Sequence, residues 1–267
     1  MGADIKKLRI RIKSVDSTLH LTRAMGLVAS SKIRRAMAAM ENGRAYERAV
    51  RDAIRPLLFS PECQKSPYMR KTDGARTCLV VIAGDRGLAG GYNANIFRAL
   101  REHSFAEIIP IGKRACDRFG GEPLLAENFS YTQAQTLARR LCDGFAAGEY
   151  DRVDILGTRY ISMLEQEPIF KGLLPLLAEG DKPRGDVIFE PDEASVLDAA
   201  VPEYVAGMLI STVRESFAAE VAARRTAMDA AGKNAEEMIA ELQLAYNRAR
   251  QGAITQEITE IVAGSGM

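Results

Sequence analysis

Residues 12–36 read IKSVDSTLHLTRAMGLVASSKIRRA and lie within a proline-free segment that runs from Asp4 to Arg55. Apolar or small side chains recur in this segment at alternating steps of three and four residues, which is the pattern of a coiled-coil seam. Core helices usually have about 8 to 20 residues, so the segment predicts one long helix, about 75 Å from end to end. The seam positions are Ile5, Leu8, Ile12, Val15, Leu19, Thr22, Gly26, Ala29, Ile33, Ala36 and Met40.

A second proline-free segment follows Pro202. Residues 203–262 predict another long helix, about 90 Å in length. Alanine dominates its middle, and small side chains of this kind permit close approach to a neighbouring helix. Its apolar positions include Ile210, Phe217, Val221, Met228, Met238, Leu242, Tyr246, Ala249, Ala253, Ile258 and Ile261.

Charge is distributed unevenly between these segments, although the net charge of the 267-residue chain is only +1. Residues 1–55 carry thirteen Lys and Arg side chains against five acidic ones, whereas residues 203–262 carry six basic and nine acidic side chains. Opposite charges favour pairing across the flanks of two antiparallel helices. The sequence therefore predicts that the N- and C-terminal segments form an antiparallel coiled coil.

The middle of the chain follows a different pattern, in which strand-like runs alternate with helical stretches. Such alternation is typical of an α/β domain with parallel strands. The expected strands are TCLVVIAG (77–84), EIIPIG (107–112), RVDILGTRYI (152–161) and GDVIFEP (185–191). The predicted fold class is α/β, with a long antiparallel coiled coil of the terminal helices and an inserted Rossmann-like α/β domain. Its predicted parts are residues 1–57, 75–200 and 203–267.

A glycine-rich turn, GDRGLAGG, follows the first expected strand at residues 84–91. Phosphate-binding loops occur at such turns, so a nucleotide-binding α/β enzyme is one alternative. The turn lacks the Lys and Ser/Thr of a P-loop and the spacing GxGxxG, and a tight strand-to-helix connection also explains its glycines. Asp85 and Arg86 are charged residues at the exposed carboxyl end of a strand, where functional residues gather. A turn whose charges pair locally explains them as well.

Basic clusters in the first helix, RIRIK and SKIRRA, make a helical nucleic-acid-binding protein the second alternative. In DNA-binding coiled coils the basic region precedes the seam, whereas Lys6–Lys13 lie within it. The acidic C-terminal segment also offers a protein partner for this positive charge. We therefore expect no nucleic-acid binding.

The sequence predicts no catalytic, metal or cofactor site. Its four cysteines lack CxxC spacing and only two histidines accompany them, so we expect free thiols rather than zinc ligands. Ser, His and Asp do not occur in a GxSxG arrangement. No apolar run approaches the roughly 20 residues that cross a bilayer, and no apolar h-region follows the basic start.

The last segment, YNRARQGAITQEITEIV at residues 246–262, carries isoleucines and valine at helical spacing. The predicted C-terminal helix is longer than the N-terminal one, so we expect its end to project beyond the pair. A projecting helix with an apolar stripe needs another protein to cover it. An ordinary coiled-coil seam is the alternative explanation.

Three motifs together resemble the gamma subunit of F-type ATP synthases. They are the segment of residues 12–36, DRGLAGGYNANI at residues 85–96, and YNRARQGAITQEITEIV. Their order and separation also match, and the resemblance covers essentially the whole chain.

The resemblance implies a non-catalytic central-stalk rotor, present once per complex, that transmits torque between an ion-driven ring of c subunits and a catalytic ring of alpha and beta subunits. The terminal helices would form a shaft inside the catalytic ring, and the α/β domain would lie next to the epsilon subunit and the c-ring. Nucleotides would bind to alpha and beta. The complex would place this chain at the cytoplasmic side of the cell inner membrane, as a peripheral subunit.

The resemblance further implies contacts with the alpha–beta ring. Arg250 and Gln251 match family residues that contact a beta-subunit loop as a catch. Met25 matches a position that faces an acidic loop of beta, and Arg86 lies where the foot of the shaft meets the bottom of the ring. The tip of the shaft would sit in an apolar bearing through Ile254, Ile258 and Ile261.

Overall fold

The computed structural model describes residues 2–70, 72, 74–101, 103–122, 124–178, 180 and 187–264. These residues form two compact units. Unit 1 consists of residues up to Ser30 and from Arg224 onward, and unit 2 consists of Ser31–Ala223. The elements are α1 (Gly2–Leu58), two short 3₁₀ helices (Cys63–Lys65 and Pro67–Met69), β1 (Thr77–Ile82), α2 (Tyr92–Ala99), β2 (Glu107–Ile111), α3 (Lys113–Phe119), α4 (Tyr131–Ala146), β3 (Arg152–Tyr160), β4 (Gln166–Leu174) and α5 (Glu193–Gly264).

The two long helices, α1 and α5, confirm the predicted architecture, and each contributes to both units. The predicted seam of α1 is also confirmed, because each of its eleven positions is buried or half-buried. The predicted division of the chain at 57, 75, 200 and 203 describes functional parts and stays a prediction. The compact units divide both helices along their length, because one part of α5 packs on the sheet and the neighbouring part of α1 shares that core.

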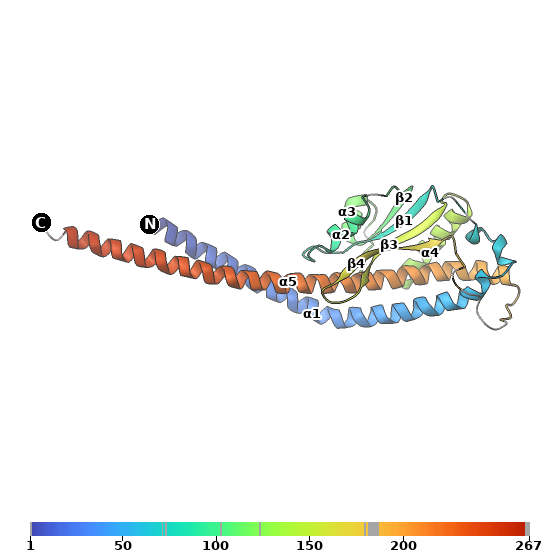
Figure 1. Ribbon diagram of the computed structural model, residues 1–267, viewed down its shortest axis with the longest axis horizontal. Helices are drawn as coiled ribbons and strands as arrows, with labels where there is room; N and C mark the ends of the chain where they lie inside the picture. Colours follow the sequence, from blue (N-terminus) through green and yellow to red (C-terminus); the bar gives the residue numbers. More distant parts are fainter. Residues whose placement is uncertain are drawn as a thin grey trace. The chain divides into compact units, whose positions relative to one another are not determined.

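In unit 1 the two helices run antiparallel, and α5 continues past the first residues of α1 (Figure 1). Small residues close the seam: a Cβ added at Gly232 would lie 3.7 Å from Thr22 Oγ1 and 3.9 Å from Leu19 Cδ1. The ion pair between Arg23 and Glu236 joins the helices, but both side chains are more than half exposed. An exposed pair contributes at most about 1 kcal/mol, so close packing rather than charge holds this pair of helices together.

Unit 2 is built on a four-stranded mixed sheet with the order β2-β1-β3-β4. The strands β2 and β3 pair in parallel with β1, as predicted, whereas β4 pairs antiparallel with β3. The sequence analysis misses β4 because Pro168 and Gly172 interrupt its pattern. Proline is tolerated there since β4 is an edge strand.

The expected strand at 185–191 is wrong for the residues that the structure describes. Residues 187–191 are not in a strand, and 185 and 186 lie outside the described residues. Val187 and Ile188 are largely exposed, so their apolar run does not indicate burial in a sheet. Apolar composition by itself does not distinguish a strand from an exposed loop.

The start of α5 also differs from the prediction. The helix begins at Glu193 rather than at residue 203, and Pro202 lies inside it. Asp192 caps this earlier start, since its carboxylate accepts hydrogen bonds from the Ser195 backbone N–H at 2.8 Å and from the Ser195 hydroxyl at 2.7 Å. These bonds favour the charged carboxylate and lower the pKa of Asp192.

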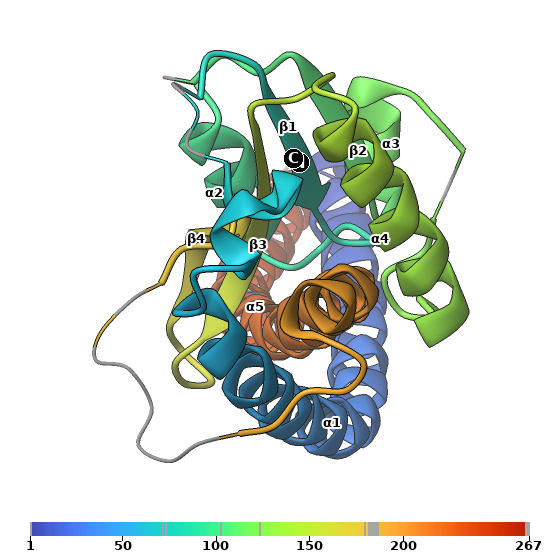
Figure 2. The same ribbon diagram turned by 90° about the vertical axis from the view of Figure 1, so that its right-hand side faces the viewer.

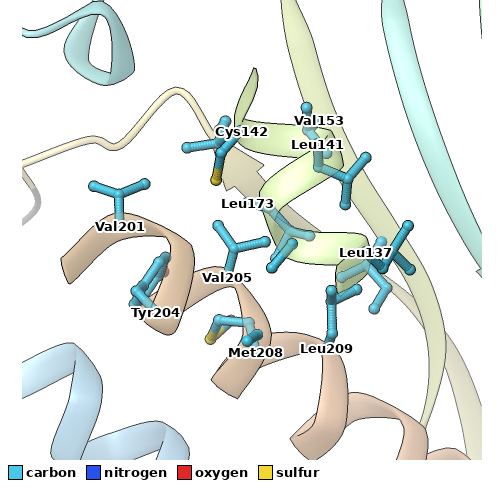
Figure 3. Close-up of a cluster of buried hydrophobic side chains, with 14 of the residues drawn as sticks. Leu137, Leu141, Cys142, Val153, Leu173, Val201, Tyr204, Val205, Met208 and Leu209 are labelled. Atoms are coloured by element: carbon cyan, nitrogen blue, oxygen red, sulfur yellow. The ribbon is translucent and has the colours of Figure 1, made fainter. Parts of the chain in front are cut away.

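Both faces of the sheet are covered by hydrophobic packing. Side chains of β1 alternate, so that Cys78, Val80 and Ile82 face one cluster and Leu79 and Val81 face the other. The larger cluster contains α4, α5 and the end of α1, and α5 lies between the sheet and α1 (Figure 2). Figure 3 shows part of this core, with side chains of α4, β3, β4 and α5 directed toward one another. The labelled residues are Leu137, Leu141, Cys142, Val153, Leu173, Val201, Tyr204, Val205, Met208 and Leu209.

Within the described part of the chain, α5 is the single helix that is long and apolar enough to cross a membrane, and its most apolar window has a mean hydropathy of 1.4. Yet 67% of its most apolar window is buried inside the structure. The apolar character of this helix is therefore accounted for by its position in the core of unit 2.

The packing of α5 on β3 predicts the effect of one substitution. In Gly157→Ala the new Cβ would lie 2.4 Å from Thr212 Cγ2 and 2.9 Å from Ser216 Oγ, so helix and strand would have to separate. We expect a loss of about 1 to 3 kcal/mol in the free energy of unfolding, measured by urea unfolding followed by circular dichroism. The control is Gly172→Ala on β4, whose Cβ would meet its nearest atom, Asp154 Oδ1, at an ordinary 3.6 Å. Equal stability of the two variants would contradict this account.

Candidate functional site

The glycine-rich turn after β1 is a tight connection between the strand and α2. Leu88 and Gly90 have positive φ angles of 61° and 57°, and the Gly84 N–H donates a hydrogen bond to Asn93 Oδ1 at 2.9 Å. Gly112 allows the turn between β2 and α3 to lie against the backbone that follows β1, since a Cβ at Gly112 would lie 1.9 Å from the carbonyl oxygen of Ala83. These glycines are therefore explained by backbone geometry and close approach.

Asp85 organises the loops beside this turn. Its carboxylate accepts three backbone hydrogen bonds, from Lys113 at 3.2 Å, Ala126 at 3.0 Å and Glu127 at 2.8 Å. A carboxylate that accepts several backbone N–H groups holds the segments that supply them in one arrangement. The position of Glu127 thus follows from Asp85.

Arg86 extends from the same turn with 68% of its side chain exposed. Its guanidinium lies 4.0 Å from the Glu127 carboxylate, which also pairs with Lys32 on α1. The backbone N–H of Arg86 donates to Glu220 Oε1 at 3.4 Å. The turn is therefore locally paired, and the guanidinium of Arg86 still faces solvent.

The far end of α5 in unit 1 is exposed. Arg250 and Gln251 are exposed, and the exposed fractions of Ile254, Ile258 and Ile261 are 47%, 56% and 65%. Met25 is half-buried and lies on α1, away from this end. The structure thus brings Arg250, Gln251 and the three isoleucines together on one helical segment, and places Arg86 in the other unit.

The length of the exposed end follows from the pairing of the helices. Arg9 Nη2 donates to the Tyr246 hydroxyl at 2.8 Å, and its guanidinium lies 5.7 Å from the centre of the tyrosine ring. Seven residues nearer the N-terminus, Gly2 is therefore level with about Ala253. The described part of α5 continues to Gly264, so about three helical turns, roughly 16 Å, have no α1 residue beside them.

Sequence reasoning missed a second set of exposed apolar side chains in unit 1. Leu21 and Val28 are seven residues apart on α1 and are more than half exposed, as is Leu27. Their signal in the sequence is that they are apolar yet lie outside the seam positions. Exposed apolar side chains of this kind form further candidate contact positions: Ile10, Leu21, Leu27, Val28 and Leu244.

The described residues contain no cluster of His, Cys, Asp and Glu that could hold a metal ion. All four cysteines are buried free thiols, as the sequence analysis expects. Burial raises the pKa of Cys78 and of Cys142 to about 12, so both thiols are neutral at physiological pH. Neutral buried thiols react poorly, and this does not favour a redox role for them.

A cavity in unit 2 has a volume of about 710 Å³ and lies between α1, β4 and α5. Cationic side chains line it, and carboxylates pair with several of them. Arg152 Nε lies 2.8 Å from both oxygens of Asp154, and Lys171 Nζ lies 3.3 Å from Glu47 Oε2. Arg152 and Lys171 are therefore already paired with carboxylates beside the cavity.

Sequence comparisons place this architecture among known proteins. Residues 4–266 match the family model described as ATP synthase. The ATP synthase gamma chain of Ruminococcus albus is 39% identical, with 98% of each chain covered. The ATP synthase gamma chain of Acetobacterium woodii, described as sodium ion specific, is 35% identical, with 99% of each chain covered.

Solved structures share the fold. A chain of the mitochondrial ATP synthase rotor of Euglena gracilis superposes with a TM-score of 0.71 at 19% identity, covering 95% of this chain and 100% of that chain. A chain from the central stalk and c-ring of the Tetrahymena thermophila mitochondrial ATP synthase gives a TM-score of 0.63 at 22% identity, covering 79% and 99%.

Two long paired helices and an α/β domain, with apolar side chains exposed at the end of one helix, indicate a protein whose helical part contacts other proteins. The chain belongs to the ATP synthase gamma chain family, which confirms the resemblance found in the sequence. It is a non-catalytic rotor subunit of the central stalk of an F-type ATP synthase, and it transmits torque in the coupling of ion transport to ATP synthesis or hydrolysis. The complex that it belongs to is membrane-bound.

The role of Asp85 can be tested by removing its carboxylate. Asp85→Ala leaves three backbone N–H groups without their acceptor, so we expect a loss of about 2 to 3 kcal/mol in the free energy of unfolding in urea. Asp117→Ala is the matched control, because the Asp117 carboxylate is half exposed and pairs with Arg114 at 3.5 Å. That control should change stability by less than about 0.5 kcal/mol, and an equally mild effect of Asp85→Ala would argue against its organising role.

Proposed function

We propose that unit 1 is the part of the shaft that enters the ring of alpha and beta subunits, with one copy of this chain in each complex. The observation that carries this proposal is the exposed apolar end of α5, at Ile254, Ile258 and Ile261, beyond the last position that α1 reaches. Three such side chains on one helix need a surrounding protein surface. A ring of alpha and beta subunits would supply this surface as a bearing.

The composition of this end suits a bearing. Gly252, Ala253 and Thr255 keep the helix slim, and nothing lies within 4 Å of the position of a Cβ at Gly252. The hydroxyls of Thr255 and Thr259 are satisfied within the helix, by the carbonyl oxygens of Gln251 and Thr255. These two hydroxyls are therefore not available to hold the helix to one position of the ring.

Arg250 and Gln251 are proposed to form the catch with a beta-subunit loop, and Met25 to face an acidic loop of beta. Arg250 and Gln251 are exposed on the turn that precedes the apolar tip, so both side chains are accessible to a neighbouring subunit. Arg86 is proposed to contact the bottom of the ring. Its exposed guanidinium and its ion pair with Glu127 are compatible with an exchange of carboxylate partners.

The α/β domain in unit 2 is proposed to be the foot of the stalk, in contact with the epsilon subunit and the c-ring. The chain would then act at the cytoplasmic side of the cell inner membrane, as a peripheral subunit. In functional terms we propose residues 1–57 and 203–267 as the shaft and residues 75–200 as the foot domain.

Reconstitution with alpha and beta subunits tests the proposal. We expect one copy of this chain per alpha–beta hexamer and a raised ATPase activity relative to the hexamer without it. A different stoichiometry, or no association, would refute the shaft assignment. Tight binding of labelled ATP to the isolated chain would favour the nucleotide-binding alternative. A steeply salt-dependent affinity for duplex DNA would favour the nucleic-acid alternative.

The bearing role predicts the effect of a truncation. Deletion of residues 254–267 removes the apolar tip but leaves the sheet and its core unchanged. We expect a weaker complex with the alpha–beta ring, measured by the concentration dependence of assembly, and an unchanged thermal unfolding transition of unit 2. A complex of undiminished stability would contradict the bearing role.

The catch predicts a separate effect. Arg250→Ala removes one charge-assisted hydrogen bond to the ring, so we expect ATP-driven turnover to fall about fivefold or more while assembly stays intact. The matched control is Arg248→Ala, an exposed arginine half a turn away on the same helix. Normal turnover of Arg250→Ala, or an equal loss in the Arg248→Ala control, would count against the catch.

A further inference from the structure

We infer that side chains of α5 occupy the backbone N–H donors at the carboxyl edge of the sheet in unit 2, and that torque passes between the foot domain and α5 through this contact. The inference rests on the proposed function for its mechanical part. Three side chains of α5 form the contact, and we call them the α5 plug: Glu215, Ser216 and Glu220.

The side chain of Glu220 reaches from α5 to the backbone of the glycine-rich turn. Only 1% of this residue is exposed, and its Oε1 accepts the Arg86 backbone N–H at 3.4 Å. A Cβ on Gly84 would lie 2.8 Å from Glu220 Cδ and 2.9 Å from its Oε1. The carboxylate therefore lies directly against the backbone of the turn, where a bound phosphate would lie in a nucleotide-binding α/β protein.

Ser216 holds the end of β3 in the same way. Its hydroxyl accepts the Thr158 backbone N–H at 2.9 Å, and its own carbonyl oxygen accepts the Tyr92 hydroxyl at 2.9 Å. Tyr92 is the first residue of α2, so a helix on the opposite face of the sheet is connected to α5 through the edge. Burial raises the pKa of Tyr92, which keeps its hydroxyl protonated and able to donate.

Glu215 completes the contact and extends it to α1. Its Oε1 accepts the Tyr160 backbone N–H at 3.2 Å and lies 2.6 Å from Arg44 Nη2. Arg44 also donates to the carbonyl oxygen of Tyr160 at 2.9 Å, and Lys171 Nζ lies 3.8 Å from Glu215 Oε2. Glu215 thus receives groups from α1, β3 and β4 together.

The α5 plug has the properties that a torque-bearing contact requires. Apolar packing is non-directional, so a helix held by packing alone slides or rotates at little cost. If α5 moved along the sheet, its buried carboxylates would lose the hydrogen bonds that they accept and would still be excluded from water. A shift of α5 by even one residue is therefore strongly unfavourable. The plug therefore sets one axial and rotational position of α5 on the sheet.

The same contact explains why the glycine-rich turn has the geometry of a nucleotide-binding turn but lacks the residues that bind phosphate. The backbone N–H groups of Arg86, Thr158 and Tyr160 are directed at the edge where a nucleotide would bind, and all three donate to α5. A phosphate at this edge would have to displace the carboxylate of Glu220.

The test compares ATP synthesis by the complete enzyme, which requires torque against a load, with ATP hydrolysis by the detached catalytic part, which does not. Glu220→Gln keeps the shape of the side chain and removes its charge, and Gly84→Ala forces the carboxylate away from the turn. The enzyme is reconstituted in ion-tight vesicles, where an imposed ion gradient drives ATP synthesis against the load of torque. Hydrolysis of ATP by the detached catalytic part, which carries no membrane load, is measured in parallel.

We expect both variants to lower ATP synthesis about tenfold while unloaded hydrolysis changes less than about twofold. The matched controls are Glu237→Gln, an exposed glutamate of α5, and Gly91→Ala, whose nearest neighbour at 3.6 Å leaves room for a Cβ. Both controls should retain the ratio of synthesis to hydrolysis of the unchanged chain.

If Glu220→Gln leaves the ratio of ATP synthesis to hydrolysis unchanged, the inference is wrong. This holds even if the melting temperature falls, because Glu220 would then stabilise the fold without carrying torque. If Gly84→Ala does not assemble, the isosteric Glu220→Gln decides. Failure of the proposed function would be distinct, since the unchanged chain itself would then not assemble with alpha and beta subunits.

Discussion

The burial of α5 on all sides is the constraint on which unit 2 depends. From Val205 to Val213 every residue of this helix is buried, with the sheet on one side and α1 on another (Figure 2). A helix surrounded in this way needs small residues wherever a neighbour comes close, as at Gly157 of the sheet and Gly43 of α1. It also needs a partner for each polar side chain that it buries. The strand ends and the turn after β1 supply partners for Glu215, Ser216 and Glu220, and Glu47 of α1 accepts the Ser211 hydroxyl.

This arrangement gives the glycine-rich turn a structural role that its sequence motif does not show. Strand-to-helix turns of α/β proteins direct backbone N–H groups toward the carboxyl edge of the sheet, and many proteins use them to bind phosphate. Here the same groups receive Glu220 from the longest helix of the chain. A fold suited to ligand binding thus serves to join a domain rigidly to a helix, in agreement with a subunit that transmits torque and leaves nucleotide chemistry to others.

The elements of the fold differ in how strongly neighbouring residues specify them. The helices α1 and α5 and the strands β1 to β3 were predictable, because uninterrupted periodic patterns specify them locally. The edge strand β4 was not, since Pro168 and Gly172 weaken its pattern and its pairing with β3 supplies the missing stability. The end of α5 was predictable as an exposed apolar stripe, whereas the roles of Arg250 and Met25 followed only from the resemblance to a family and stay predictions.

The sequence by itself determined that two long helices flank an α/β domain and that the C-terminal helix is the longer one. Its motifs also identified the resemblance to ATP synthase gamma chains. These conclusions follow from periodicity, breaker residues and motifs, which are properties of neighbouring positions in the chain. Only the tertiary structure decided what fills the turn at Gly84 and Arg86. Glu220 is more than 130 positions away, and no local pattern shows that its carboxylate meets those backbone groups, because their contact depends on how the whole of α5 packs on the sheet.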